Sequence, residues 1–232
     1  MHVCGEVALI TSKNYEIAMK RILMLVANGV EPLEMAAFTD VMGWATLIGK
    51  EEIDLVDVGL KSKIKTTFGL QFTPNILLNE INLHGSLINF IDDFDALAIP
   101  GGFEPSGFYD DALSKPFLDV IRHFSKQNKV IASVCVSSIC LGESGVLKGK
   151  NATIYHQLGG KRKQQLEDTG ANFVDQPVVI DGNFITSTGP GTALEVAFKL
   201  LEILTDKENA DNLRLRMRMP TPSQEWYTGV QV

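Results

Sequence analysis

The feature that most constrains the fold is the alternation of strand-like and helix-like segments along the chain. Residues 21–27 (RILMLVA) form a nearly continuous apolar run, which is typical of a strand buried on both faces of a sheet. A helical pattern follows over residues 31–44, and Pro32 suits its first turn. Because this order repeats, the sequence predicts an α/β fold whose sheet is mostly parallel and carries helices on both faces.

The remaining segments continue the same order. Further strands are expected at residues 45–48, 53–58, 96–99, 130–134 and 152–154. Helices are expected after Ser114 as far as residue 127, at 136–143, at 160–168, and from the segment GPGT (189–192) to about residue 204. Two hairpins are expected, one within residues 61–72 and one around Asp181-Gly182-Asn183.

The length of the chain fits one domain. Its 232 residues are 45% hydrophobic, which is enough for a single sizeable core. We expect an N-terminal extension over residues 1–20, a domain over 21–219 and a tail over 220–232 that contains Trp226 and Tyr227.

Charge and cysteine usage narrow the class of partner. The net charge of −7 disfavours nucleic acid, because proteins that grip phosphates usually have a basic surface. No apolar run approaches the roughly 18–20 residues of a membrane helix, and no secretory leader is recognisable. The three cysteines form no disulfide framework, and no phosphate-loop or dinucleotide motif occurs. The sequence therefore predicts a cytoplasmic protein with free thiols, and it shows no motif for a cofactor or a metal.

Cys135 is the first candidate for chemistry. It ends a predicted buried strand and directly precedes a helix, which is the arrangement of a nucleophile elbow. We expect the N–H groups of that helix to favour the thiolate. The alternative for Cys135 is that it is a buried structural cysteine. We assign that structural role to Cys140, which lies inside the predicted helix. Cys4 receives no role.

Other candidates also follow predicted strands. The backbone of Gly101 and Gly102 could hold an oxyanion together with the N–H of Val136, although a plain turn is the alternative. Glu34, with Glu31 at the start of the first helix, is either a dipole partner or a carboxyl of raised pKa that can donate a proton. His156 follows a short strand and is either a packed residue or a catalytic one.

Four motifs taken in order resemble the ThiJ/PfpI superfamily, whose members are class I glutamine amidotransferase-like. These motifs are RILMLVANGVEPLE, ALAIPGG, VIASVCVSS and TSTGPGTALEVAFKLLEIL, and the match covers residues 21–219. The resemblance implies a flavodoxin-like three-layer sandwich and a homodimer. It also implies Cys135 as the nucleophile, Glu34 against its sulfur and His156 near the site.

Two positions depart from the superfamily pattern. Val136 stands where protease-like members carry histidine, which weakens a peptidase function. Thr188 stands where other members carry arginine, which weakens an anion-sensing pocket. The stretch CVSSICLGESGVLKGKNATIYH also resembles the isocyanide-hydratase and regulator branch.

Three functions follow from this resemblance. The leading hypothesis is a glyoxalase- or deglycase-like enzyme in which Cys135 attacks a reactive carbonyl and Glu34 moves the proton. The second is a redox-sensing or chaperone-like protein that works through oxidation of Cys135. The third is an isocyanide hydratase or amidase.

Overall fold

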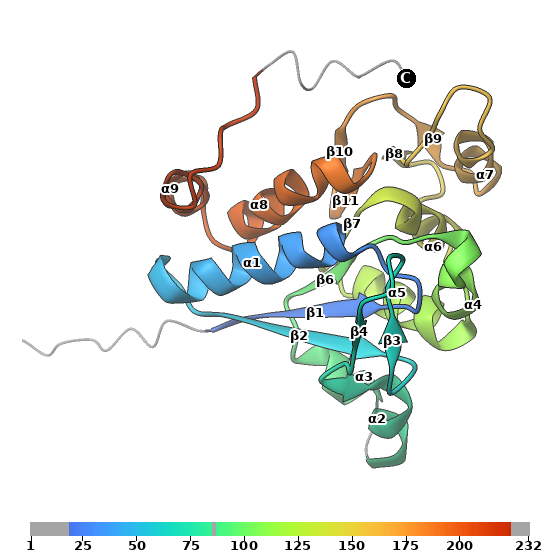
Figure 1. The fold of residues 1–232 in the computed structure, drawn as a ribbon, viewed down its shortest axis with the longest axis horizontal. Helices are drawn as coiled ribbons and strands as arrows, with labels where there is room; N and C mark the ends of the chain where they lie inside the picture. The colour runs from blue at the N-terminus through green and yellow to red at the C-terminus, as the bar shows by residue number, and fades with distance from the viewer. Residues whose placement is uncertain (1–18, 85–86, 224–232) are drawn as a thin grey trace, which may run out of the picture.

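A seven-stranded sheet forms the centre of the molecule in the computed structural model, which describes residues 19–84 and 87–223 (Figure 1). In spatial order the strands are β10 (Val178–Asp181), β11 (Phe184–Ser187), β7 (Val130–Ser133), β6 (Ala96–Ile99), β1 (Lys20–Val26), β2 (Ile53–Gly59) and β5 (Ile76–Leu77). The pairs from β11 to β5 are parallel, and β10 pairs antiparallel with β11 around the predicted Asp-Gly-Asn turn. The prediction of a mostly parallel sheet is therefore confirmed.

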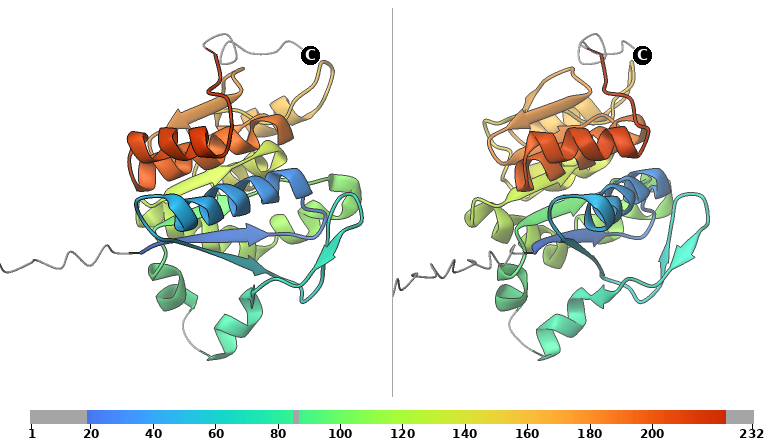
Figure 2. Two further views of the ribbon diagram at one scale, coloured as in Figure 1. Left: turned by 60° about the vertical axis from the view of Figure 1, so that its left-hand side comes forward. Right: turned by 90° about the vertical axis from the view of Figure 1, so that its left-hand side faces the viewer.

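Helices cover both faces of this sheet. On one face α1 (Pro32–Ile48) packs beside α8 (Ala193–Leu204), and α9 (Lys207–Arg216) lies against α8 (Figure 2). On the other face α5 (Lys115–Lys126) packs against β6 and β7. The strand between these layers supplies the centre of the core, since Ile22 and Leu25 of β1 are fully buried. The flavodoxin-like three-layer sandwich is confirmed.

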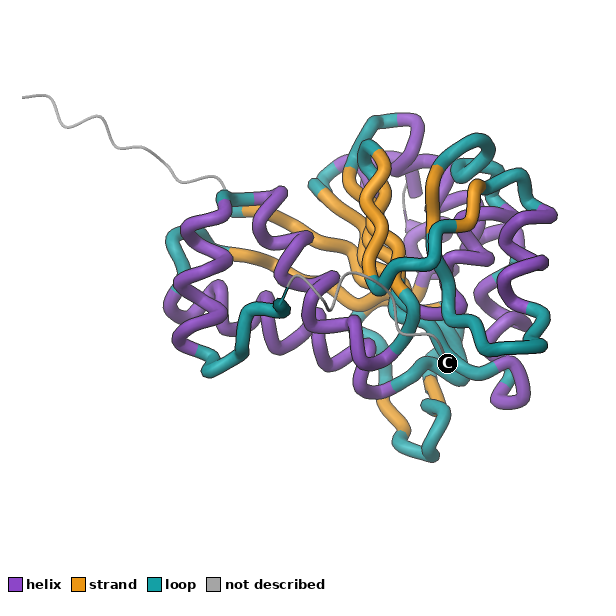
Figure 3. Tube along the Cα trace, turned by 90° about the horizontal axis from the view of Figure 1, so that it is seen from above, coloured by secondary structure: helices purple, strands orange, loops and turns teal. Residues whose placement is uncertain are grey.

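Shorter elements complete the chain. The remaining helices are α2 (Leu78–His84), α3 (Leu87–Asp92), α4 (Phe108–Ala112), α6 (Ser138–Glu143) and α7 (Arg162–Asp168), with 3-10 turns η1 (Glu104–Ser106), η2 (Cys135–Ser137) and η3 (Pro190–Thr192). Two small sheets pair β3 (Ile64–Lys65) with β4 (Gln71–Phe72) and β8 (Asn151–Ala152) with β9 (Asn172–Phe173). The β3–β4 hairpin, predicted within residues 61–72, projects away from the main sheet (Figure 3).

One prediction about elements is wrong. Residues 45–48 are not a strand, because α1 continues to Ile48 and keeps Ala45 on its buried face. The helix predicted to end near residue 204 is confirmed as α8, and a further helix, α9, was not predicted. This helix is mostly polar, so its hydrophobic periodicity is weak; its signal is Asp206, whose side chain caps it by accepting a hydrogen bond from the Asn209 N–H at 2.7 Å.

Some predictions concern residues at the two ends of the chain. Cys4, Trp226 and Tyr227 lie outside the described residues, and the division into extension, domain and tail stays a prediction. The first strand begins at Lys20, next to the expected boundary. Within residues 19–84 and 87–223, no helix is both long and apolar enough to cross a membrane.

The sheet topology brings the candidate site residues to one edge. Strands β1, β6, β7 and β11 are parallel, so their carboxyl ends lie at the same edge of the sheet. The segments after them carry, in turn, Glu34, Gly102, Cys135 and Pro190. Residues that are far apart in the sequence thereby meet at one place.

Candidate active site

Cys135 lies on a strained turn between β7 and the following 3-10 turn. Its φ is +61°, in the left-handed region that residues other than glycine seldom adopt. The Ser137 hydroxyl fixes the turn. It accepts a hydrogen bond from the Val134 N–H at 3.0 Å and donates one to the Ile99 carbonyl oxygen at 2.9 Å. The backbone thus has the form of the predicted nucleophile elbow.

Glu34 is fully buried beside this turn, at the start of α1. The Gly101 N–H donates a hydrogen bond to Glu34 Oε2 at 2.6 Å. A Cβ at position 101 would lie 2.6 Å from the Val134 carbonyl oxygen and 2.8 Å from Glu34 Oε2, so this approach requires glycine. In the described part of the chain, Glu34 Oε1 has no hydrogen-bond partner of standard geometry.

The carboxyl and the thiol shift each other's ionisation. Burial raises the pKa of Glu34 to about 8, against the smaller opposing effects of the Gly101 N–H and the Cys135 side chain. Burial, followed by the negative charge of Glu34, raises the pKa of Cys135 well above its usual range. The Val136 N–H favours the thiolate as the sequence suggested, but this effect is smaller. The expected contribution of the helix N–H is therefore present, but burial and Glu34 outweigh it and favour the neutral thiol.

Cys140 matches the structural role assigned to it. It is fully buried within α6, and burial raises the pKa of its thiol far above the usual range. It does not line the pocket described next.

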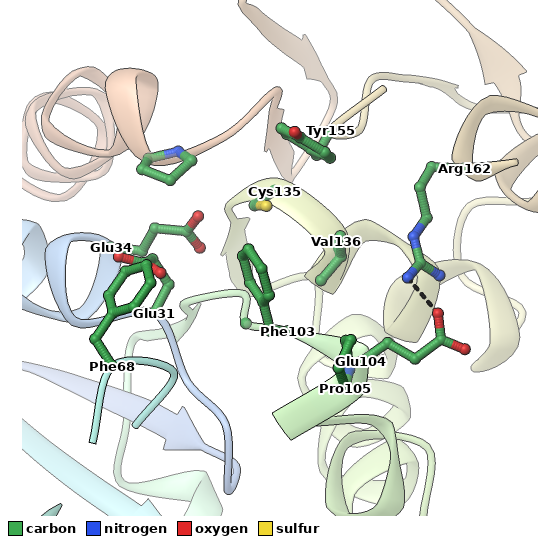
Figure 4. Close-up of a pocket in the computed structure, with 12 residues that line it drawn as sticks. Glu31, Glu34, Phe68, Phe103, Glu104, Pro105, Cys135, Val136, Tyr155 and Arg162 are labelled. Carbon is green, nitrogen blue, oxygen red and sulfur yellow. Dashed lines mark hydrogen bonds and ion pairs between the residues drawn. The ribbon is translucent and has the colours of Figure 1, made fainter. Parts of the chain in front are cut away.

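A pocket of about 400 Å³ opens over Cys135 (Figure 4). The segments after β1, β6, β7 and β11 supply most of its lining, and the other lining residues come from the β3–β4 turn, η1, the segment after β8 and α7. The lining residues are Glu31, Glu34, Phe68, Gly102, Phe103, Glu104, Pro105, Cys135, Val136, Tyr155, Arg162 and Pro190. Partial burial also raises the pKa of Glu31.

The predicted oxyanion donors have different places in this site. Gly102 and Val136 line the pocket, whereas the Gly101 N–H is already bonded to Glu34. A Cβ at position 102 would lie 2.3 Å from the carbonyl oxygen of Gly29, so glycine is required there as well. Gly102 and Val136 are therefore the candidates for holding an oxyanion, and Gly101 positions Glu34.

The structure does not bring His156 to Cys135. Its Nε2 lies 3.1 Å from Asp175 Oδ1, its Nδ1 lies 2.8 Å from the carbonyl oxygen of Ile154, and its ring packs edge-on against Phe173. The preceding residue, Tyr155, lines the pocket instead. His156 itself is not among the residues that line the pocket.

A cation and three aromatic residues of the pocket, Tyr155 among them, were not predicted from the sequence. Arg162 begins α7, and its side chain is only 15% exposed and lines the pocket. Phe68 and Phe103 lie near each other at the pocket, with ring centroids 6.2 Å apart. The motifs give no signal for these residues, since each depends on how a connecting segment folds over the site.

No metal site is found in the part of the chain that the structure describes, where no group of three or more His, Cys, Asp or Glu side chains is placed to hold an ion. The pocket itself carries groups that can react. It offers a sulfur nucleophile, a carboxyl whose pKa lies near neutrality and backbone N–H groups at a strained turn.

The fold and the site together define a class: flavodoxin-like proteins with a cysteine on a nucleophile elbow and a buried glutamic acid beside it. The chain belongs to the DJ-1/PfpI family, whose family model matches residues 20–203. The resemblance to the ThiJ/PfpI superfamily is thereby confirmed.

Relatives with established names fall in the same family. The chain is 32% identical over 207 residues to "Glutathione-independent glyoxalase DJ-1" of Schizosaccharomyces pombe, covering 87% of this chain and 100% of that one. It is 32% identical over 100 residues to "Deglycase PfpI" of Pyrococcus furiosus, covering 43% of this chain and 56% of that one. It spans about half of "Protein DJ-1 homolog A" of Arabidopsis thaliana, with 29% identity over 211 residues, 89% of this chain and 49% of that one.

A solved structure agrees with the sequence relatives. The crystal structure of Drosophila melanogaster DJ-1beta matches 88% of this chain and 100% of its own, with a TM-score of 0.73 and 29% identity. The relatives thus include proteins named as a glyoxalase and as a deglycase, and this chain shares the fold of the Drosophila protein.

Proposed function

We propose that this protein is a cofactor-independent enzyme that converts small 2-oxoaldehydes to 2-hydroxy acids, a glyoxalase- or deglycase-like reaction centred on Cys135. The observation that carries the proposal is the pairing of Cys135 on its strained turn with Glu34, whose pKa of about 8 suits proton transfer near neutral pH. The names of the S. pombe and P. furiosus relatives support the same chemistry.

The first half of the reaction forms a bond between sulfur and carbon. The Glu34 carboxylate accepts the thiol proton as the Cys135 sulfur attacks the aldehyde carbon, and the N–H groups of Gly102 and Val136 hold the resulting oxyanion. Glu34 then returns its proton to this oxygen, which gives a neutral hemithioacetal. Because the pocket places the sulfur, Glu34 and Gly102 around one cavity, these steps need no large movement of the protein.

The second half moves hydrogen between neighbouring carbons. Glu34 removes the proton from the former aldehyde carbon and delivers a proton to the adjacent carbonyl carbon through an enediol. The first carbon is oxidised to a thioester and the second is reduced to an alcohol, so no external oxidant is required. Water then breaks the carbon–sulfur bond, which releases the 2-hydroxy acid and restores the Cys135 thiol.

The test uses methylglyoxal in deuterated water, with lactate followed by NMR. The parent protein should form lactate that carries deuterium on its second carbon, because the shuttled proton passes through the exchangeable Glu34 carboxyl. Cys135→Ser should lose more than about 10³-fold in turnover while keeping its fold, and the control Cys140→Ser should stay within about twofold of the parent. Equal turnover by Cys135→Ser would refute the sulfur mechanism, and lactate formed by Glu34→Gln at the parent's rate and with the parent's deuterium content would refute Glu34 as the shuttle.

The two other hypotheses fit the site less well. Oxidation by peroxide requires thiolate character, and the raised pKa of Cys135 opposes it near neutral pH. Peptide mass spectrometry after mild peroxide measures this directly, since a sensor would oxidise Cys135 selectively over Cys140. A hydratase or amidase would turn over isocyanides or amides faster than aldehydes when all are assayed on one preparation.

We also propose that the protein works in the cytoplasm as a homodimer on small molecules. This assembly is implied by the family and is measured by light scattering after size-exclusion chromatography. A mass of about 25 kDa, that of one 25.5 kDa chain, would contradict it.

A further inference from the structure

The pocket extends well beyond the reacting atoms, which bears on the substrate of the proposed glyoxalase-like reaction. Its volume of about 400 Å³ falls in the range typical of sites for molecules of drug size, roughly 300–1,000 Å³. The chemistry proposed above involves only two carbons of the substrate. A three-carbon aldehyde would therefore leave most of the cavity unfilled. The residues that line the rest of the cavity indicate what the remaining part of a larger substrate would be.

The middle of the pocket is aromatic. Phe103 and Tyr155 line it together with Phe68, and the two phenylalanine side chains belong to residues that are 48% and 72% exposed. Aromatic rings left partly exposed at a concave site can bury their surface against a ligand. An aromatic or otherwise apolar segment of the substrate fits this part of the cavity.

A cation stands at the end of the pocket away from Cys135 (Figure 4). Arg162 Nη2 bonds Glu104 Oε2 at 2.6 Å and Nη1 bonds Gln165 Oε1 at 2.9 Å, which hold the guanidinium in place over the Tyr109 ring. Lys161 lies 2.9 Å from the same Glu104 oxygen, so two cations share one carboxylate and this end keeps a positive charge.

The opposite end of the pocket is acidic. Glu31 and Glu34 line it beside Cys135. A substrate with an aldehyde at one end and an anion at the other would be oriented by Arg162, which attracts the anion, while the carboxyls beside Cys135 offer the anion no cation. The aldehyde would then face the sulfur.

We propose that the substrates of this site are 2-oxoaldehydes with an apolar or aromatic segment that ends in a carboxylate, and that Arg162 binds this carboxylate. The planar fork of a guanidinium matches a carboxylate with two parallel hydrogen bonds, and its position is already fixed by Glu104 and Gln165. This proposal rests on the proposed function for its reaction, but the carboxylate preference belongs to Arg162 alone.

The experiment compares two aldehydes of equal shape, 4-carboxyphenylglyoxal and 4-carbamoylphenylglyoxal. The parent protein should show kcat/KM about 10–100-fold higher for the carboxylate, as a charge-assisted pair in a partly buried site provides. Arg162→Gln should bring this ratio close to one, mainly by lowering kcat/KM for the carboxylate. The matched control is Lys163→Gln, which removes a cation of the same helix that lies over the Phe173 ring outside the pocket and should preserve the ratio.

A second measurement separates this inference from the proposed function. Binding of the unreactive ketones 4-acetylbenzoate and 4-acetylbenzamide is measured by calorimetry on the parent, Arg162→Gln and Arg162→Lys proteins. If no aldehyde is converted but the benzoate binds better and loses this advantage in Arg162→Gln, the reaction is wrong and the carboxylate site stands. Equal binding of the two ketones by the parent, or a preference that survives Arg162→Gln, overturns the inference. Arg162→Lys should keep part of the preference, because it retains the charge without the fork.

Discussion

Cys135 and Cys140 lie five positions apart in one stretch of chain, and burial raises the pKa of both. Each also has a glutamate that acts on it electrostatically, Glu34 for the first and Glu143 for the second. Yet Cys135 lies on a strained turn that lines a pocket, whereas Cys140 lies within α6 with no exposed surface.

This difference shows what makes a cysteine a candidate nucleophile in this fold. Burial and a raised pKa do not distinguish the two residues, so neither property identifies the site. The left-handed turn delivers one sulfur to the carboxyl edge of the sheet, where the segment after β6 and the start of α1 add Gly102 and Glu34. The surrounding cavity, with a carboxyl that can accept the proton, gives Cys135 its proposed role.

Replacing each of the two glutamates by glutamine in turn tests this comparison, and it has the largest expected effect. Glu34→Gln should lower kcat/KM for methylglyoxal by about 10²–10⁴-fold, because it removes the proton acceptor and donor while its amide oxygen can still accept the Gly101 N–H. Glu143→Gln, on the exposed end of α6, should change it by less than about twofold. Similar losses in both variants would mean that the two cysteine environments do not differ in function.

The pH profile of the parent protein belongs to the same comparison. Because Glu34 must be ionised to accept the thiol proton and burial raises its pKa to about 8, kcat/KM should rise about tenfold per pH unit below that value and level off above it. A flat profile between pH 6 and 8 would show that Glu34 does not limit the reaction.

Chemical labelling sharpens the contrast in access. Iodoacetamide should modify Cys135 on the order of 10²-fold faster than Cys140 in the folded protein, because only the pocket admits the reagent. The rate at Cys135 should increase with pH, since burial and Glu34 raise its pKa and the thiolate is the reacting form. Peptide mass spectrometry over time gives both rates, and labelling in denaturant should make them equal. Equal rates in the folded state would remove the distinction.

The buried carboxyl of Glu34 should also make the free energy of unfolding depend on pH, which is a smaller effect. The folded-state pKa of Glu34, about 8, is above its ordinary value of 4.5, so the unfolded chain loses this proton first as pH rises. The free energy of unfolding should therefore fall between about pH 5 and 8, by on the order of 2–5 kcal/mol from this group. Urea titrations of the parent and Glu34→Gln should show this fall only in the parent, apart from a residual slope from Glu31. Parallel curves would mean that burial does not raise the pKa of Glu34.

The position of Cys135 and its neighbours at the edge of the sheet could be predicted from the sequence, because it depends on local pattern. The apolar run of β1, the glycines after β6 and the cysteine between β7 and α6 mark the ends of parallel strands, and topology then brings these ends together. Glu34 and Cys135 could be predicted for that reason.

The rest of the pocket could not be predicted in the same way. Phe68 comes from the turn of a projecting hairpin, and Arg162 begins a helix of only seven residues. No periodicity reports how such segments pack over a distant strand end. The Thr188 departure suggested a weak anion pocket, yet a cation reaches the site from α7, an element outside the four motifs.

The sequence also did not show which of the adjacent residues Tyr155 and His156 lines the pocket. Substituting His156 gives the smallest expected effect. His156→Asn should change kcat/KM for phenylglyoxal by less than about threefold, because its ring is bonded to Ile154 and Asp175 outside the pocket. The Asp175 side chain is 52% exposed, so loss of this contact should leave the fold intact. Tyr155→Ala should raise KM for the same substrate by about fivefold, since it removes an aromatic wall of the cavity. A tenfold or larger loss of kcat in His156→Asn would place the histidine among the reacting groups and would contradict the orientation of its side chain in the structure.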